Sequence, residues 1–99
     1  KFGVHTEEVL PLIQKISTFS HIKICGLMTI APNVKNPEEN RLYFAKLRKL
    51  LVDIKGKNID NINMDILSMG MTNDYEVAIE EGATMVRVGT GIFGVREYI

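Results

Sequence analysis

The chain has 99 residues, of which 45% are hydrophobic, and twelve lysines and arginines balance twelve aspartates and glutamates. This length allows one domain with a modest core, and the zero net charge argues against a nucleic-acid or anionic-membrane binder. No apolar run approaches the roughly 18 residues of a membrane helix, and the single cysteine, Cys25, excludes an internal disulfide and favours a cytoplasmic location. Because the sequence starts at Lys1 without an initiator methionine, we expect a piece of a longer chain.

The first predicted unit is a helix followed by a strand. Thr6 is the expected N-cap, and Pro11 predicts either a kink or a helix that starts near Leu10. Residues 22–28 form a short apolar run bounded by polar residues, which predicts the strand.

The second unit has the strongest start signal in the chain. Asn36 is the expected N-cap, Pro37 occupies the first helical position, and an acid follows where it completes a capping box. The helix is expected to end at residues 55–57, and residues 64–67 predict the next strand. The longest loop, residues 29–36, precedes this helix.

In the third unit, Thr72 or Asn73 caps a helix that Gly82 ends, and residues 84–88 form a strand. Helices that alternate with strands predict an α/β fold with parallel strands. A sheet of three parallel strands leaves two edges unpaired. Two interpretations follow, a small open α/β domain or part of a (β/α)₈ barrel, which usually takes about 250 residues.

Two segments have the composition of phosphate-binding turns. The first leaves a predicted strand and enters a helix, where backbone amides and hydroxyl groups attract an anion. Its residues are Ser68, Met69, Gly70, Met71 and Thr72. An ordinary tight turn with an N-cap explains the same residues.

The second segment, residues 89–94, matches the G-x-G-x-x-G spacing and also follows a strand. A dinucleotide-binding fold would need a further helix, a strand and an acid about 20 residues on, and only residues 95–99 remain. What survives is a glycine-rich group of backbone amides around Gly89 and Thr90.

Arg87 lies between two valines of the third strand, and alternation places its side chain on the opposite face from theirs. A cation on a buried face needs a partner. That partner is either a ligand or an acid of the chain, Asp65 or Asp74.

The other polar residues are weaker candidates for a functional site. His5 and His21 are expected on the surface without metal-ligand spacing, so we expect no metal site. Asp74 is placed on a solvated helix face, and Cys25 in the core. Lys23 starts its strand, the wrong end for a barrel active site.

Three motifs resemble those of the pyridoxal phosphate homeostasis proteins, the YggS/PROSC or alanine racemase-like family. They are GLMTIAP at residues 26–32, LSMGMTNDYEVAI at 67–79 and VRVGTGIFG at 86–94. The resemblance extends over essentially all of residues 1–99. It implies a (β/α)₈ barrel like the N-terminal domain of alanine racemase, of which this chain would be the C-terminal part.

The resemblance also implies that the protein binds pyridoxal 5′-phosphate (PLP) and acts in vitamin B6 and amino-acid homeostasis, without robust enzymatic activity. By position, Ser68 and the amides up to Thr72 would hold the phosphate, Gly89 and Thr90 would close its other side, and Arg87 would face the pyridine nitrogen. The lysine that forms the Schiff base in the family belongs to an earlier strand, so no catalytic residue is assigned in this chain.

The expected partners are therefore PLP and either the missing half of the barrel or a second copy of the chain, with no nucleic acid and no membrane. An amino-acid racemase is the enzymatic alternative. A third possibility is a barrel enzyme that binds a phosphorylated sugar or an indole-type substrate through the same loops.

Overall fold

A computed structural model describes residues 3–94 of the chain, and the figures follow its elements in order. They are α1 (Thr6–Ile16), β1 (Ile24–Met28), the 3₁₀ helix η1 (Pro37–Asn40), α2 (Arg41–Lys55), β2 (Ile62–Met71), α3 (Tyr75–Glu80), β3 (Met85–Arg87) and α4 (Thr90–Phe93). The strands form one parallel sheet in the order β1-β2-β3. The predicted α/β class with three helix–strand units is confirmed.

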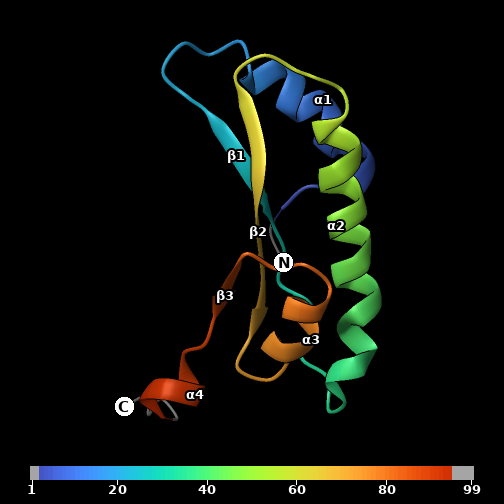
Figure 1. The fold of residues 1–99 in the computed structure, drawn as a ribbon, viewed down its shortest axis with the longest axis vertical. Coiled ribbons are helices and arrows are strands. Elements are labelled where there is room, and N and C mark those ends of the chain that lie inside the picture. The colour runs from blue at the N-terminus through green and yellow to red at the C-terminus, as the bar shows by residue number, and fades with distance from the viewer. Residues whose placement is uncertain (1–2, 95–99) are drawn as a thin grey trace.

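Helices cover one face of this sheet. Figure 1 shows α1, α2 and α3 on the same side, with α2 running beside β2. The apolar side chains between these layers form two clusters. One contains Phe44, Leu67, Met69, Val77 and Ala78, and the other Ile13, Ile54 and Met64. The core therefore lies entirely between the helices and one side of the sheet.

The opposite face of the sheet has no such cover among residues 3–94. Met28 pairs with Ser68 and Ser68 pairs with Met85, so these three residues share a face. Met28 is 57% exposed and Met85 51% exposed. Arg87 shares the face of Met85, because it lies two positions after Met85 along β3. An apolar sheet face with a cation at its end is thus open to solvent.

The start predicted for the first helix needs correction, and the start predicted for the second is confirmed. α1 begins at Thr6 with His5 as its N-cap, because the His5 carbonyl accepts from the Glu8 amide at 2.9 Å. Pro11 lies inside this helix, so the expected start near Leu10 was wrong. The Asn36 cap is confirmed, since its side chain accepts from the Glu38 amide at 3.1 Å. It opens the 3₁₀ helix that leads into α2, and α2 ends at Gly56 as expected.

β2 runs from Ile62 to Met71 and is much longer than the predicted strand of residues 64–67. Pairing with both neighbouring strands extends it, since Ser68 pairs with Met28 and with Met85. The expected turn at residues 68–72 is therefore mostly strand. α3 is capped by Asp74, and the predicted caps Thr72 and Asn73 lie before it.

Arg41 joins the start of α2 to the end of α3. Its guanidinium donates to Glu38, Glu80 and Glu81 at 2.8, 2.6 and 2.8 Å. The hydrogen bond from Arg41 is the main cause that lowers the pKa of the Glu38 carboxyl below its ordinary value of 4.5. A lowered pKa in the folded state adds stability above pH 4.5, and this is lost as the pH falls through the folded-state pKa.

Replacing Arg41 with glutamine is therefore expected to lower the free energy of unfolding at pH 7 and to change it much less at pH 3. Urea unfolding at the two pH values measures the difference, which stays small because the cluster is partly exposed to solvent. Arg48→Gln, on the exposed side of α2, is the control. Equal destabilisation by Arg41→Gln at both pH values would contradict the role of the carboxylates.

Candidate functional site

The two segments predicted to bind phosphate lie in contact. The Gly91 amide donates to the Thr72 hydroxyl oxygen at 3.0 Å. A Cβ at Gly91 would lie 2.9 Å from the Thr72 methyl carbon, so only glycine allows this approach. The end of β2 and the start of α4 therefore meet, although 19 residues separate them in the sequence.

Arg87 lies beside this contact, at the end of β3. Its Nη2 donates to the Thr29 carbonyl at 2.9 Å, and the Thr29 amide donates to the Ser68 carbonyl at 3.1 Å. The Arg87 side chain thus joins the chain that leaves β1 to the end of the sheet. Its Nε is buried and has no partner among the residues that the structure describes.

Neither acid proposed as a structural partner of Arg87 takes that role. Asp65 accepts from Lys55 at 3.1 Å. Asp74 accepts from the Asn40 amide and from the Met71 backbone. A buried N–H without a partner costs free energy. The interpretation of Arg87 as half of an ion pair was wrong within residues 3–94, and its Nε–H is available to a ligand.

The first predicted cradle is not an open loop of amides. Met69 is fully buried in the core, and Gly70, at φ +103°, packs so closely that a Cβ would lie 2.7 Å from Ala78. The Met71 amide donates to Asp74 at 2.8 Å. Ser68 is half-buried on the open face of the sheet. Of this segment, Ser68 lies on the open face of the sheet, and the Thr72 side chain lies against Gly91.

The second predicted cradle forms the four-residue helix α4. The Gly89 carbonyl accepts from the Ile92 amide at 3.1 Å and from the Phe93 amide at 2.8 Å. The Thr90 amide lies in the first turn, where a helix offers no partner of its own. A Cβ at Gly89 would meet no atom of residues 3–94 within 4 Å. Gly89 is therefore not crowded by the described part of the chain, while the Gly91 amide is committed to Thr72.

Sequence reasoning missed two residues next to this site, Asn40 and Asp74. Asn40 is fully buried and Asp74 is 8% exposed, and they are joined by a 2.8 Å hydrogen bond. Asp74 was wrongly placed on a solvated helix face. The available signal was helical spacing, because Asn40 lies four residues before Phe44 and so extends the buried stripe of α2.

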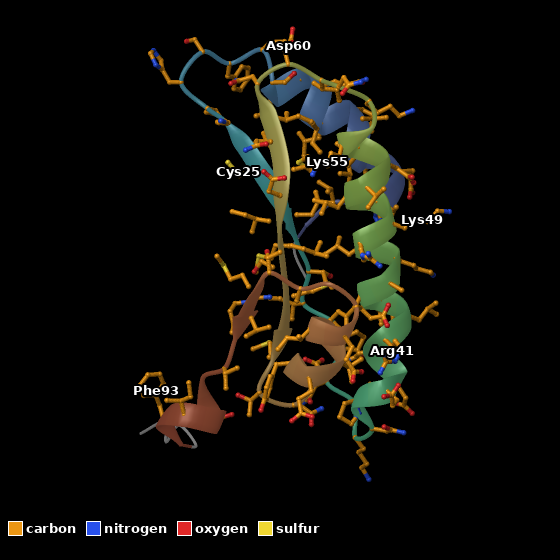
Figure 2. All side chains as sticks on the ribbon, viewed as in Figure 1. Cys25, Arg41, Lys49, Lys55, Asp60 and Phe93 are labelled. Carbon is orange, nitrogen blue, oxygen red and sulfur yellow. The ribbon has the colours of Figure 1, made fainter. Side chains whose placement is uncertain are left out.

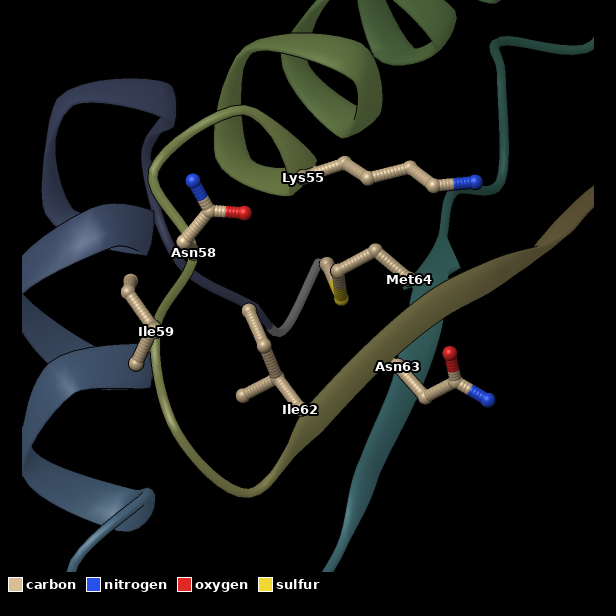
Figure 3. A pocket seen from close by; sticks show the side chains of 6 residues that line it. All are labelled: Lys55, Asn58, Ile59, Ile62, Asn63 and Met64. Atoms are coloured by element: carbon tan, nitrogen blue, oxygen red, sulfur yellow. The ribbon is translucent and has the colours of Figure 1, made fainter.

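The described residues form two cavities at opposite ends of β2. The first, about 320 Å³, lies at the start of β2, at the opposite end of that strand from Thr72. In Figure 3 the Lys55 amino group points away from Asn58, while Ile62 and Met64 project between them. Polar groups do not converge there, so it does not have the character of a binding site.

The second cavity, about 390 Å³, borders the predicted site and is lined by Thr72 and the residues that follow it. Glu38 and Glu76 also line it. With Asp74, three carboxylates line this cavity and disfavour a phosphate there. This cavity therefore does not suit the phosphate end of a ligand. No group of residues within 3–94 has the composition of a metal site.

Comparison with known proteins shows the class. The family model of the alanine racemase N-terminal domain matches residues 1–97. The chain therefore belongs to the alanine racemase N-terminal domain family. Within the described part, every helix is too short or too polar to cross a membrane.

The relatives are more specific. A pyridoxal phosphate homeostasis protein of Aquifex aeolicus (strain VF5) is 47% identical over 98 residues, which cover 99% of this chain and 42% of the relative. The resemblance to that group, drawn from the three sequence motifs, is confirmed. The chain spans about two fifths of the length of the curated relatives it matches.

Solved structures agree with the fold. A crystal structure of an unknown protein from Bifidobacterium adolescentis has a TM-score of 0.87 and 41% identity, over 94% of this chain and 37% of the other. PipY of Synechococcus elongatus PCC7942, solved with PLP bound, has a TM-score of 0.83 and 33% identity, over 93% of this chain and 43% of PipY. The helix-covered sheet described above is therefore shared with a protein that binds PLP.

Proposed function

We propose that this chain carries the phosphate and pyridine-nitrogen side of a PLP site in a protein of vitamin B6 and amino-acid homeostasis. The observation that carries the proposal is the buried Nε–H of Arg87, which has no partner among residues 3–94 and lies beside the contact between Thr72 and Gly91. A cation with a spare donor and a neighbouring group of hydroxyls and amides match the two polar ends of PLP. The relatives named for pyridoxal phosphate homeostasis support the same cofactor.

The residues fit the two ends of the cofactor differently. Ser68 and Thr72 donate hydroxyl groups to the phosphate, and Gly89 and Thr90 offer open space and backbone amides on its other side. Met69, Gly70 and Met71 set the shape of the strand end. The Met71 amide already donates to Asp74, so it is not a free donor.

Arg87 faces the pyridine nitrogen in this proposal. Arginine stays protonated and can only donate hydrogen bonds, so the ring nitrogen next to it stays unprotonated. Bound PLP supplies an electron-withdrawing ring, and an unprotonated nitrogen makes that ring a weaker acceptor of negative charge. This property suits storage or delivery of the cofactor better than transamination.

We propose further that the chain forms the C-terminal part of a (β/α)₈ barrel, with helices outside and the open sheet face inside. The uncovered Met28 and Met85, the two unpaired edges of the sheet and the greater length of the relatives support it. The missing strands, or a second copy of the chain, would cover those edges. β1, β2 and β3 contain no lysine, so covalent attachment of PLP is assigned to the other part of the barrel.

Gly89→Val in the complete protein that carries this sequence tests the proposed site. The Cβ of the added side chain meets no atom of residues 3–94 within 4 Å, so the fold should tolerate it. The affinity for PLP, measured by titration of the cofactor's absorbance, is expected to fall about tenfold or more, as for the loss of a charge-assisted hydrogen bond. Gly56→Val at the end of α2 is the matched control.

Unchanged PLP affinity in Gly89→Val would count against the proposed site. The match to the alanine racemase N-terminal domain keeps an amino-acid racemase as the second candidate function. Incubation of the complete protein with L-alanine, followed by chiral analysis for D-alanine, decides between the two. Formation of the D-form at a catalytic rate would favour the racemase.

A further inference from the structure

A buried polar network stands directly behind the proposed phosphate site. The Asn40 amide nitrogen donates to Asp74 Oδ2 at 2.8 Å and to the Pro32 carbonyl at 2.9 Å. The other carboxylate oxygen, Asp74 Oδ1, accepts from the Met71 amide at 2.8 Å. The network thus ties the long loop after β1, the start of α2 and the end of β2 together at one point.

The amide orientation of Asn40 is fixed by its surroundings. Its nitrogen donates to two oxygen atoms, the Pro32 carbonyl and Asp74 Oδ2. Rotating the amide by half a turn would place the Asn40 oxygen against the Pro32 carbonyl oxygen and against Asp74 Oδ2. Its own Oδ1 is buried without a partner among the described residues. The pair therefore keeps one arrangement at the cost of one unsatisfied acceptor.

Asp74 connects this network to the proposed site through the backbone. Its carboxylate holds the Met71 amide, and Thr72 follows immediately with the hydroxyl that receives the Gly91 amide. A second bond pins the same turn, since the Asn73 side chain donates to the Val34 carbonyl at 2.7 Å. The position of Thr72 relative to Thr90 thus depends on the bonds made by its two neighbours.

We infer that Asn40 and Asp74 are positioning residues for the phosphate end of the ligand. They hold the turn after β2 so that Thr72 meets the phosphate, without touching the ligand themselves. This inference rests on the proposed function. Their effect should be larger at the phosphate end, because the Arg87 guanidinium is held by the Thr29 carbonyl, and only its backbone pairs with Met71. Displacement of a contact by about 1 Å is enough to reduce a site's effectiveness strongly.

The test compares PLP with pyridoxal, which lacks the phosphate, in the complete protein. In Asp74→Asn an oxygen still accepts from Met71, but the new amide nitrogen opposes the nitrogen of Asn40. We expect the affinity for PLP to fall about tenfold and the affinity for pyridoxal to fall much less. Adding Asn40→Asp places an acceptor opposite that new donor, although it also places an oxygen against the Pro32 carbonyl. We therefore expect only part of the PLP affinity to return.

Asp53→Asn, on the exposed side of α2, is the matched control and should change neither affinity. Urea unfolding without ligand separates binding from stability, and Asn40→Ser offers a smaller change if Asp74→Asn does not fold. A parallel fall in both affinities, or no fall in either, would overturn the positioning role. A native protein that binds PLP no more tightly than pyridoxal would instead overturn the proposed phosphate site itself.

Discussion

Replacing Arg87 with leucine is expected to lower the affinity for PLP roughly 10- to 100-fold in the complete protein. The change removes a charge-assisted hydrogen bond at the pyridine nitrogen, which contributes about 1.5–3 kcal/mol. It also removes the bond to Thr29 and, with it, a buried Nε–H that has no partner in the described chain. These two effects oppose each other, so the stability of the ligand-free protein should change by less than about 1 kcal/mol.

Titration of the cofactor's absorbance and urea unfolding without ligand measure the two quantities separately. Arg48→Leu, an exposed arginine of α2, is the control and should change neither. The absorbance of bound PLP should also shift in Arg87→Leu, because the ring nitrogen loses its donor. Unchanged affinity and an unchanged spectrum would remove Arg87 from the site.

Gly26→Ala is expected to destabilise the protein by about 3 kcal/mol or more, at the upper end of overpacking effects. A Cβ at Gly26 would lie 1.9 Å from the Ile66 carbonyl oxygen, its partner on the neighbouring strand. A backbone oxygen cannot move aside as a flexible side chain can, so β1 must separate from β2. Thr29 follows β1 and would be displaced, so the PLP affinity should fall as well.

Gly56→Ala provides the comparison in the same urea experiment. Its Cβ would lie 3.6 Å from the nearest carbonyl oxygens, an ordinary contact, and its φ is −69°. The alanine is expected to be neutral or to stabilise by about 0.5 kcal/mol. An unfolding midpoint for Gly26→Ala equal to that of Gly56→Ala would show that the two strands do not approach as closely as described.

Short-range sequence patterns correctly predicted some of the helix ends and the face of the sheet on which Arg87 lies. Asn36 and Pro37 started the second helical segment as expected, and Gly82, at φ +104°, ended α3. Alternation placed Arg87 on the face opposite Val86, which packs towards Gly70 and the helices. Each of these outcomes follows from a capping residue, a proline or glycine at a helix end, or the alternation of side chains along a strand, all of which can be read from the sequence.

Long-range pairing explains the predictions that failed. Residues 68–71 have the composition of a turn, but hydrogen bonding to strands on both sides extends β2 through them. Cys25 was expected in the core and is exposed, because within residues 3–94 its side of the sheet has no covering layer; Figure 2 shows it on the side of β1 away from α2. Burial depends on what packs against a face, which the local pattern does not state.

The sequence by itself determined the order of the helices and strands, their parallel arrangement and the family to which its motifs belong. These properties follow from side-chain periods, caps and short motifs. Only the tertiary structure decided that Thr72 meets Gly91, that Asn40 and Asp74 form a pair, and that the buried Arg87 Nε–H finds no partner in the part of the chain that the structure describes. The Thr72–Gly91 bond joins positions 19 apart in the sequence, and the Asn40–Asp74 bond joins positions 34 apart. Such bonds depend on how the whole chain folds back on itself, and no local pattern encodes them.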